Sequence, residues 1–338
     1  MQRIAFITGV TGQDGSYLAE FLIGRGYAVH GLVRRASAFN RLRIEHLRLD
    51  PAIYGKSFFL HYGDLQDATS LRRIIAQVKP DEIYHRAGQS HVGLSFEIPE
   101  VTCNEVATAT LGLLEIVRDH AHAPRVFHAA SSEIVGAPAH VPQNEDTPTR
   151  PRNPYGCAKA FAGDLCRVYR ENYGLFVCNG IAYNHESPRR GENFVTRKIS
   201  LAAARIKLGL QRELTLGDLD ARRDWGYAPE YVDAMWRMLQ QEKPGDYILA
   251  TNETHSIREF LAAAFSRAGL DWERHVKFDS RFQRPSETNQ LVGDYAKAKR
   301  DLGWEPHTRM PALAALMVDA DLANLQGDGA GDRAPVAG

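Results

Sequence analysis

Tyr155 and Lys159 have the residue types and the spacing of a proton-transfer pair. They form a Tyr-x-x-x-Lys pattern, and residues four apart lie on the same face of a helix. A lysine ammonium beside a tyrosine favours the phenolate and so lowers the pKa of the tyrosine. An activated tyrosine can take the proton of a sugar hydroxyl while hydride passes to a nicotinamide. The spacing also arises by chance, so its meaning depends on the residues around it.

Residues 130–133 read Ala-Ser-Ser-Glu and follow a predicted buried strand upstream of Tyr155. A hydroxyl at this point can hydrogen-bond the reacting oxygen beside Tyr155. Glu133 is not needed for simple hydride transfer. Its carboxylate could abstract a carbon-bound proton or protonate a leaving hydroxyl. The alternative is that Glu133 is a structural ion-pair or capping residue.

A glycine-rich turn, Gly-Val-Thr-Gly-Gln-Asp-Gly at 9–15, lies between the first predicted strand and a helix. Such glycines permit a tight turn and let the backbone approach a pyrophosphate, whose charge then lies at a helix N-terminus. The alternative is a purely structural turn. We expect this turn to bind a dinucleotide through Gly9, Thr11, Gly12, Gln13 and Asp14.

Arg34 and Arg35 follow the second predicted strand. Enzymes that bind NAD usually have an acidic residue here, which accepts from the ribose 2′-hydroxyl. A guanidinium instead binds phosphate oxygens through paired donors. The pair favours NADP over NAD, although a solvated basic pair is the alternative.

Further cofactor contacts are expected where the third and fourth predicted strands end. Asp64, followed by Leu65, can accept from the adenine amino group. Near Gln89, small residues such as Ala87 let the cofactor pass close to the backbone.

The order of elements predicts an α/β fold, a Rossmann-type doubly wound parallel sheet with a smaller mixed α/β C-terminal substrate domain. Predicted strands lie at 3–8, 28–33, 57–62, 82–85 and 125–130. Helices alternate with them at 16–24, 67–77 and 106–119. Ligands of such sheets bind at the carboxyl ends of the strands.

The second half of the chain has a looser pattern. A polar stretch at 185–191 is expected to break regular structure, and helices are expected at 196–208, 230–241 and 257–268. We predict a cofactor domain at 1–180, a substrate domain at 181–325 that is partly interleaved with the first, and a disordered tail at 326–338.

Composition excludes several classes of function. The formal net charge is +0, which argues against a nucleic-acid surface. No apolar run reaches the roughly 18 residues of a membrane span, and no signal peptide is evident. The cysteines show no C-x-x-C spacing, which is typical of reduced thiols in a cytoplasmic protein. No metal-ligand cluster is evident, and a serine hydrolase motif at 88–92 fails because Val92 replaces the required glycine.

Together these motifs resemble the extended short-chain dehydrogenase/reductase superfamily and, within it, the GDP-mannose 4,6-dehydratases. The resemblance runs from residue 4 to about residue 322 and includes the turn at 9–18 and the segments 34–37, 60–65 and 89–92. More specific are Asn-His-Glu-Ser-Pro-Arg-Arg-Gly at 184–191 and the segments 194–199, 223–226 and 284–287. These motifs separate the family from epimerases of the same fold.

The resemblance implies a redox-neutral reaction that turns GDP-mannose into GDP-4-keto-6-deoxy-mannose. Tyr155 would deprotonate the sugar 4-hydroxyl while C4 gives hydride to a bound NADP. Glu133 would then remove the acidified C5 proton, and water would leave from C6. Hydride would return to C6, which explains why the cofactor stays bound.

The family's functional residues carry over by motif. Catalysis is assigned to Ser131, Glu133, Tyr155 and Lys159, of which the last two also bind the cofactor, as do His185 and Arg190. The GDP-sugar is assigned to Ser90, Asn184, Lys198, Arg223, Arg284 and Glu287. Cations suit a diphosphate, and a carboxylate suits ribose hydroxyls.

Four positions around the nicotinamide half of the site depart from the family pattern. Ser131 replaces a threonine, and Val135 lies in a segment that usually reads Leu-Tyr-Gly. Arg86 lies where Asn-Leu-Ala-Ala is usual and adds a charge near the cofactor, and Val101 replaces a tyrosine. The GDP half keeps its motifs, so the resemblance supports a GDP-sugar ligand more strongly than the dehydration outcome.

Alternative functions therefore stay open. A GDP-4-keto-6-deoxy-sugar reductase or a GDP-sugar 4-epimerase would need Tyr155 and Lys159 but not Glu133, and the presence of Glu133 favours dehydration. A heptose could replace the hexose. A non-catalytic NADP-binding sensor is the remote alternative. The family's loop after the second strand, matched here by 35–43, reaches a neighbouring subunit, which implies a homodimer or homotetramer.

Overall fold

A computed structural model describes residues 2–37, 39–279 and 291–327 of the chain. Its centre is a seven-stranded sheet in the order β11-β6-β5-β4-β1-β2-β3. Every pair of neighbours in this sheet is parallel. The strands are β1 (Ile4–Thr8), β2 (Ala28–Val33), β3 (Phe58–Tyr62), β4 (Glu82–His85), β5 (Arg125–Ser131), β6 (Val177–Ala182) and β11 (Asp246–Leu249).

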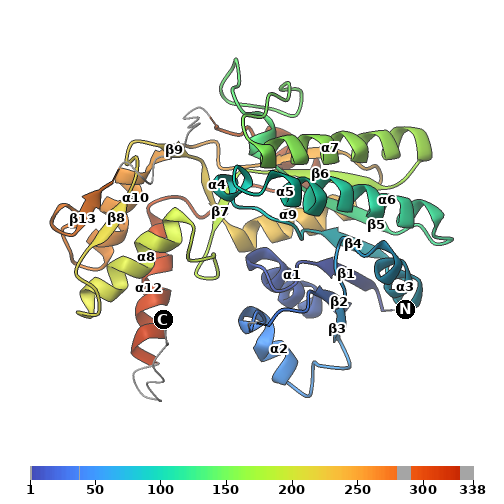
Figure 1. Cartoon of the computed structure of the whole chain (residues 1–338), viewed down its shortest axis with the longest axis horizontal. Coiled ribbons are helices and arrows are strands. Elements are labelled where there is room, and N and C mark those ends of the chain that lie inside the picture. Colours follow the sequence, from blue (N-terminus) through green and yellow to red (C-terminus); the bar gives the residue numbers. More distant parts are fainter. Residues whose placement is uncertain (1, 38, 280–290, 328–338) are drawn as a thin grey trace.

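Helices cover both faces of the sheet (Figure 1). One apolar core joins a sheet face to α1 (Gln13–Gly24), α9 (Ala228–Gln240) and α11 (Ala296–Leu302). The core on the opposite face involves α3 (Ala68–Val78), α6 (Ala109–Asp119) and α7 (Pro154–Tyr173). Because both faces are covered, β1, β2 and β6 are buried along almost their whole length, as in other doubly wound sheets.

A smaller lobe has its own core beside the carboxyl ends of the strands (Figure 1). Its helices are α8 (Val195–Lys207), α10 (Ile257–Arg267) and α12 (Ala312–Gly327). Strands β8 (Leu214–Leu216) and β13 (Val276–Phe278) pair within it. Two further ribbons join β7 (Asn184–Glu186) to β10 (Trp225–Tyr227) and β9 (Arg222–Arg223) to β12 (His255–Ser256).

Short elements connect the longer ones and border the site. The short helices are α2 (Glu45–Leu49), α4 (Val92–Ser95) and α5 (Pro99–Cys103). Three 3-10 turns lie at Leu42–Ile44, Ser132–Ile134 and Trp272–Arg274. A π-helical turn, Asn104–Thr108, joins α5 to α6.

The structure confirms the predicted fold class and the five predicted strands of the first half. Two expectations of the second half are wrong in part. The polar stretch at 185–191 begins inside β7, because this backbone pairs with β10. The predicted tail begins too early, since α12 continues through Gly327; the rest of that tail lies outside the described residues. The division at residue 180 stays a prediction, and β11 from the second half lies in the main sheet.

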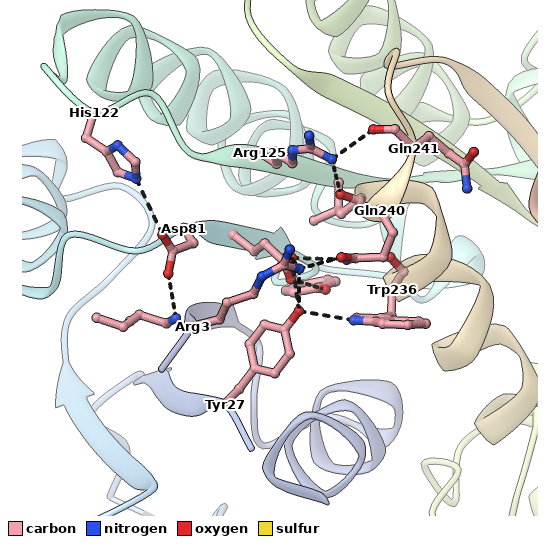
Figure 2. Close-up of polar contacts among 12 residues, drawn as sticks. Arg3, Tyr27, Asp81, His122, Arg125, Trp236, Gln240 and Gln241 are labelled. Atoms are coloured by element: carbon pink, nitrogen blue, oxygen red, sulfur yellow. Dashed lines mark hydrogen bonds and ion pairs between the residues drawn. The ribbon is translucent and has the colours of Figure 1, made fainter. Parts of the chain in front are cut away.

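A polar cluster lies at the amino end of β4 (Figure 2). Its centre is the buried carboxylate of Glu82, the first residue of β4. Glu82 accepts from the Tyr84 hydroxyl at 2.7 Å, the Gln240 amide at 3.0 Å and the Tyr27 hydroxyl at 3.1 Å. Arg3 lies 3.3 Å from the same carboxylate. We call these five residues the amino-end cluster.

The described helices include none with both the length and the apolar character that a membrane crossing requires. The four cysteines all lie in the described part of the chain and are free thiols.

Candidate active site

A cavity of about 870 Å³ opens at the carboxyl ends of β1, β4 and β5, where this fold class binds its ligands. Most of the predicted site residues line it. They are Gly9, Thr11, Gly12, Gln13, Asp14, Arg34, Asp64, Leu65, Ala87, Gln89, Ser90, Ser131, Glu133, Tyr155, Lys159, Asn184, His185 and Arg190. The structure therefore gathers residues from both halves of the chain in one place.

The glycine turn at one end of this cavity has the shape of a phosphate cradle. Gly9 has φ +75, and a Cβ there would lie 3.0 Å from the backbone nitrogen of Ala87. A Cβ on Gly15 would lie 2.1 Å from the Gly9 carbonyl oxygen, so the turn requires glycine at both positions. Gly12 caps α1 and has no side chain to bond the first N–H groups of the helix. The first N–H groups of α1 therefore lack a side-chain acceptor from the cap residue, an arrangement that suits an anion.

Asp14, in the first turn of α1, is the centre of a buried charged network. Its carboxylate pairs with Arg86, which follows β4, and lies 2.8 Å from Nε2 of His185. Burial alone would raise the pKa of the Asp14 carboxyl, but Arg86 and His185 hold it well below its usual range. The other His185 nitrogen, Nδ1, lies 2.7 Å from the Tyr183 carbonyl. The network thus ties the turn at α1 to β4 and to β7.

Gln13 and Arg43 add further links between the turn and the second half of the chain. Gln13 donates to the His185 carbonyl at 3.0 Å and accepts from the Ser187 hydroxyl at 2.8 Å. Arg43 donates to the Arg189 carbonyl at 2.7 Å and to the Thr11 carbonyl at 3.4 Å. The segment that carries His185 and Arg190 is therefore held directly over the phosphate turn.

Helix α7 places Tyr155 and Lys159 on the cavity. Asn153 caps this helix, since its side chain accepts from the Gly156 N–H at 2.7 Å. Tyr155 is buried, with Ser131 beside it on the cavity. Burial raises the pKa of Tyr155 to about 12, and this outweighs the opposing effects of Ser131, Arg190 and Arg86. The net shift is opposite to the lowering expected from the sequence.

Lys159 lies one helical turn further along and is also buried. Its Nζ donates to the Ala129 carbonyl at 2.6 Å and lies 5.8 Å from the centroid of the Tyr155 ring. Burial and, to a lesser extent, the nearby Arg86 lower the pKa of Lys159 to about 8. The lysine is therefore a buried cation held by a backbone carbonyl at the end of β5.

Glu133 reaches the cavity from the 3-10 turn that follows β5. Its backbone N–H donates to the Ser131 hydroxyl at 3.3 Å. The side-chain amide of Asn153 donates to one oxygen of the Glu133 carboxylate at 2.8 Å. Because Asn153 also caps α7, one residue fixes both Glu133 and the start of the helix that carries Tyr155. The arrangement brings a hydroxyl, a carboxylate and a phenol together, which suits proton transfer at neighbouring atoms of one ligand.

Comparison with known proteins identifies the family of the chain. The sequence model of the family described as GDP-mannose 4,6 dehydratase matches residues 6–317. The chain belongs to this family. It is 54% identical to GDP-mannose 4,6 dehydratase 1 of Arabidopsis thaliana over 95% of this chain and 90% of that protein. It is 50% identical to GDP-mannose 4,6-dehydratase of Sinorhizobium fredii, covering 96% of this chain and 98% of the relative.

A solved structure shares the fold at lower identity. The dTDP-glucose 4,6-dehydratase of Streptomyces venezuelae, solved with NAD and TYD bound, superposes with a TM-score of 0.84. It is 23% identical and covers 96% of this chain and 98% of its own. This likeness shows the fold alone.

The structure shows the contacts and the burial of Arg86, Val135 and Val101, three of the positions that depart from the family pattern. The charge that Arg86 adds is neutralised locally, because Asp14 pairs with it. The preceding residue, His85, is buried between the Thr8 and Thr110 hydroxyls at 3.0 and 3.2 Å. Burial lowers the pKa of His85 to about 3, so the imidazole is neutral. Val135 is buried in an apolar cluster, whereas Val101 lines the cavity and is 44% exposed.

Several predicted residues lie away from the cavity lining. Arg35 lines a smaller cavity of about 670 Å³ beside the first, together with Arg34. Lys198 is exposed on α8, and Arg223 donates to the carbonyl of Arg222 at 2.7 Å. Arg284 and Glu287 lie outside the described residues.

Sequence reasoning missed three side chains of the site. Arg43 and Glu105 line the cavity, and Asn153 orients Glu133. Arg43 and Glu105 had no signal in their spacing, because one follows the loop after β2 and the other lies in a π-helical turn. Asn153 could have been found from the sequence. An asparagine at the N-cap, followed by a proline as the first residue of the helix, is a typical start of a helix.

Proposed function

We propose that the chain is an NADP-dependent GDP-mannose 4,6-dehydratase, which converts GDP-mannose to GDP-4-keto-6-deoxy-mannose and water. The observation that carries the proposal is the convergence of Ser131, Glu133 and Tyr155 on one cavity, beside a turn shaped for a dinucleotide phosphate. The family relatives reported above have this activity in their names.

The residues present fit NADP. The turn that begins at Gly9 would hold the pyrophosphate at the N-terminus of α1. Arg34 lines the same cavity and would bind the 2′-phosphate, with Arg35 close by in the adjoining cavity. When bound, NADP supplies a reversible hydride acceptor. The residues of this chain would supply the orientation and the proton transfers.

Tyr155 would take the proton of the sugar 4-hydroxyl as C4 is oxidised. Burial raises the pKa of Tyr155 to about 12 although Arg190 and Arg86 act in the opposite direction, so the phenol carries its proton before substrate binds. Lys159, whose Nζ lies 5.8 Å from the centroid of the ring, is the cation that would favour the phenolate during the reaction. The Ser131 hydroxyl, which lies on the same cavity, would bind the same oxygen.

Glu133 would act after C4 has become a ketone, because the ketone acidifies the C5 hydrogen. The carboxylate would take the C5 proton and pass a proton to the hydroxyl on C6, which leaves as water. Hydride would return to C6, and C5 would regain a proton, which the proton that Tyr155 took from the 4-hydroxyl balances, so the reaction has no net change in oxidation state or protonation. Asn153 would hold one carboxylate oxygen and leave the other facing the sugar.

For the GDP-sugar, we propose Ser90 and Asn184, which line the cavity, together with Lys198 and Arg223 from the smaller lobe. Arg284 and Glu287 complete the proposal from the sequence.

A reductase or a 4-epimerase would leave Glu133 without a role, and a non-catalytic sensor would leave the whole proton-transfer group unused. We further propose that the protein is a cytoplasmic homodimer or homotetramer. Light scattering at micromolar concentration tests the oligomeric state, and a result that shows only monomer would contradict it.

The experiment is to incubate the purified protein with GDP-mannose and NADP⁺ and to follow the sugar nucleotide by mass spectrometry. The expected result is the loss of one water without net formation of NADPH. A substrate that binds but stays unchanged would overturn dehydration of GDP-mannose. The 4-keto-6-deoxy sugar offered with NADPH would then test for reductase activity.

A further inference from the structure

Glu105 is an acidic side chain at the cavity that the reaction described above does not use. It lies in the π-helical turn Asn104–Thr108, between α5 and α6. Such turns are rare and occur frequently at functional sites. The Glu105 side chain lines the cavity and is 19% exposed, so its carboxylate is partly removed from solvent.

Glu105 contacts the residue that we expect to recognise the 2′-phosphate. Arg34 extends from the end of β2, and its Nη1 donates to Oε1 of Glu105 at 3.1 Å. The Arg34 side chain is 66% exposed, so the guanidinium can still reach another partner. The ion pair links the end of β2 to the π-helical turn at the adenosine end of the proposed NADP site.

A carboxylate in this position has opposite consequences for the two nicotinamide dinucleotides. A 2′-phosphate needs the donors of Arg34, some of which already serve Glu105, and its negative charge is repelled by the carboxylate. A free 2′-hydroxyl is a donor, and a carboxylate is the kind of acceptor with which NAD enzymes bind it. Because Oε1 of Glu105 lies 3.1 Å from Nη1 of Arg34, a 2′-phosphate or 2′-hydroxyl beside this guanidinium also lies near the Glu105 carboxylate.

We propose that Glu105 is a specificity-determining residue that narrows the preference of the site for NADP over NAD. It competes with the 2′-phosphate for Arg34 and offers an acceptor to the 2′-hydroxyl of NAD. The proposal rests on the proposed function only in requiring that the cavity binds a nicotinamide dinucleotide. It predicts that the protein binds NAD measurably, alongside NADP.

The test is to measure Kd for NADP⁺ and for NAD⁺ by titration calorimetry, in the wild type and in Glu105→Gln. Loss of the charge should tighten the binding of NADP⁺ and weaken the binding of NAD⁺. The Kd for NAD⁺ divided by the Kd for NADP⁺ should therefore rise by about 3- to 5-fold, as expected for a partly exposed ion pair. Glu100→Gln is the matched control, because Glu100 is an exposed acid on the preceding helix. It should leave the ratio unchanged.

The role of Arg34 is tested by repeating the change in an Arg34→Gln background. The effect of Glu105→Gln on the ratio should then become smaller, because the competition has been removed. An equal effect in both backgrounds would overturn competition for Arg34. If Glu105→Gln still binds NADP⁺ and has the same ratio of Kd values as the wild type, the role of Glu105 in specificity is overturned, but the proposed function is not. If the wild type binds neither dinucleotide, the proposed function fails as well.

Discussion

Glu82, in β4, and Asp14, in the first turn of α1, are both buried carboxylates, but they lie at opposite ends of the central sheet and have different surroundings. Glu82, at the amino end of β4, accepts from neutral hydroxyl and amide donors, with Arg3 at its edge. Asp14, beyond the carboxyl end of β1, is paired with Arg86 and His185 beside an open cavity. One carboxylate ties packed elements together, and the other holds charged groups at a binding site.

The difference shows what each end of the sheet contributes. In the amino-end cluster the polar groups satisfy one another, and none of them is among the residues that line the candidate site (Figure 2). At the carboxyl end, Glu133, Lys159 and Tyr155 keep part of their surface toward the cavity. We therefore expect changes at the amino end to affect stability, and changes at the carboxyl end to affect chemistry or the balance of charge.

The largest effect is expected for Glu133→Gln, which keeps the shape of the side chain and removes the base. The kcat for dehydration should fall by about 10²- to 10⁴-fold, the usual contribution of a general acid–base residue. Binding of GDP-mannose and the urea unfolding midpoint should stay close to those of the wild type. Activity that survives within a factor of a few would contradict the role of Glu133.

Glu82→Ala should have the opposite profile. It leaves the Tyr27 and Tyr84 hydroxyls without their acceptor and removes one of the two acceptors of the Gln240 amide, so the free energy of unfolding should fall by about 2–3 kcal/mol. The kcat of the folded enzyme should not change. Urea titration and initial rates measure the two quantities. Glu242→Ala, an exposed position just beyond α9, is the control. A large loss of kcat without a loss of stability would break the comparison.

Arg86→Leu should destabilise the protein by about 1–3 kcal/mol, because it removes one partner of a buried charge while His185 remains. Arg86→Lys keeps a cation and should recover much of that loss. Urea unfolding of the two variants side by side checks this. Equal stability of Arg86→Leu and the wild type would show that the pairing with Asp14 is not needed for the fold.

The effect that is smallest per pH unit is a dependence of stability on pH that comes from Lys159. Its pKa falls from 10.5 to about 8 in the folded protein because of burial and Arg86. Between these pH values the unfolded chain holds a proton that the folded chain lacks, so the contribution of this group to stability rises with pH. The wild type should gain stability relative to Lys159→Met by at most about 1.4 kcal/mol per pH unit in this range. A difference that is constant from pH 8 to 10.5 would contradict the shift.

The sequence by itself determined the elements whose signals are local. Alternating apolar strands and helices predicted the parallel sheet, and the glycines at 9–15 predicted a phosphate turn that the structure shows to require glycine at Gly9 and Gly15. The Tyr-x-x-x-Lys spacing predicted that Tyr155 and Lys159 share a helix face, and both line the cavity. These features depend on periodicity and steric limits within a few residues of chain.

Only the tertiary structure decided how distant residues meet. Arg86 and His185 reach Asp14 across gaps of 72 and 171 positions. Glu105 reaches Arg34 across 71 positions, from a π-helical turn with no sequence signature. Burial also reversed the expected pKa shift of Tyr155, because desolvation depends on the whole surrounding fold. A local pattern specifies which groups are available, whereas their charges and partners depend on packing between elements that are remote in the chain.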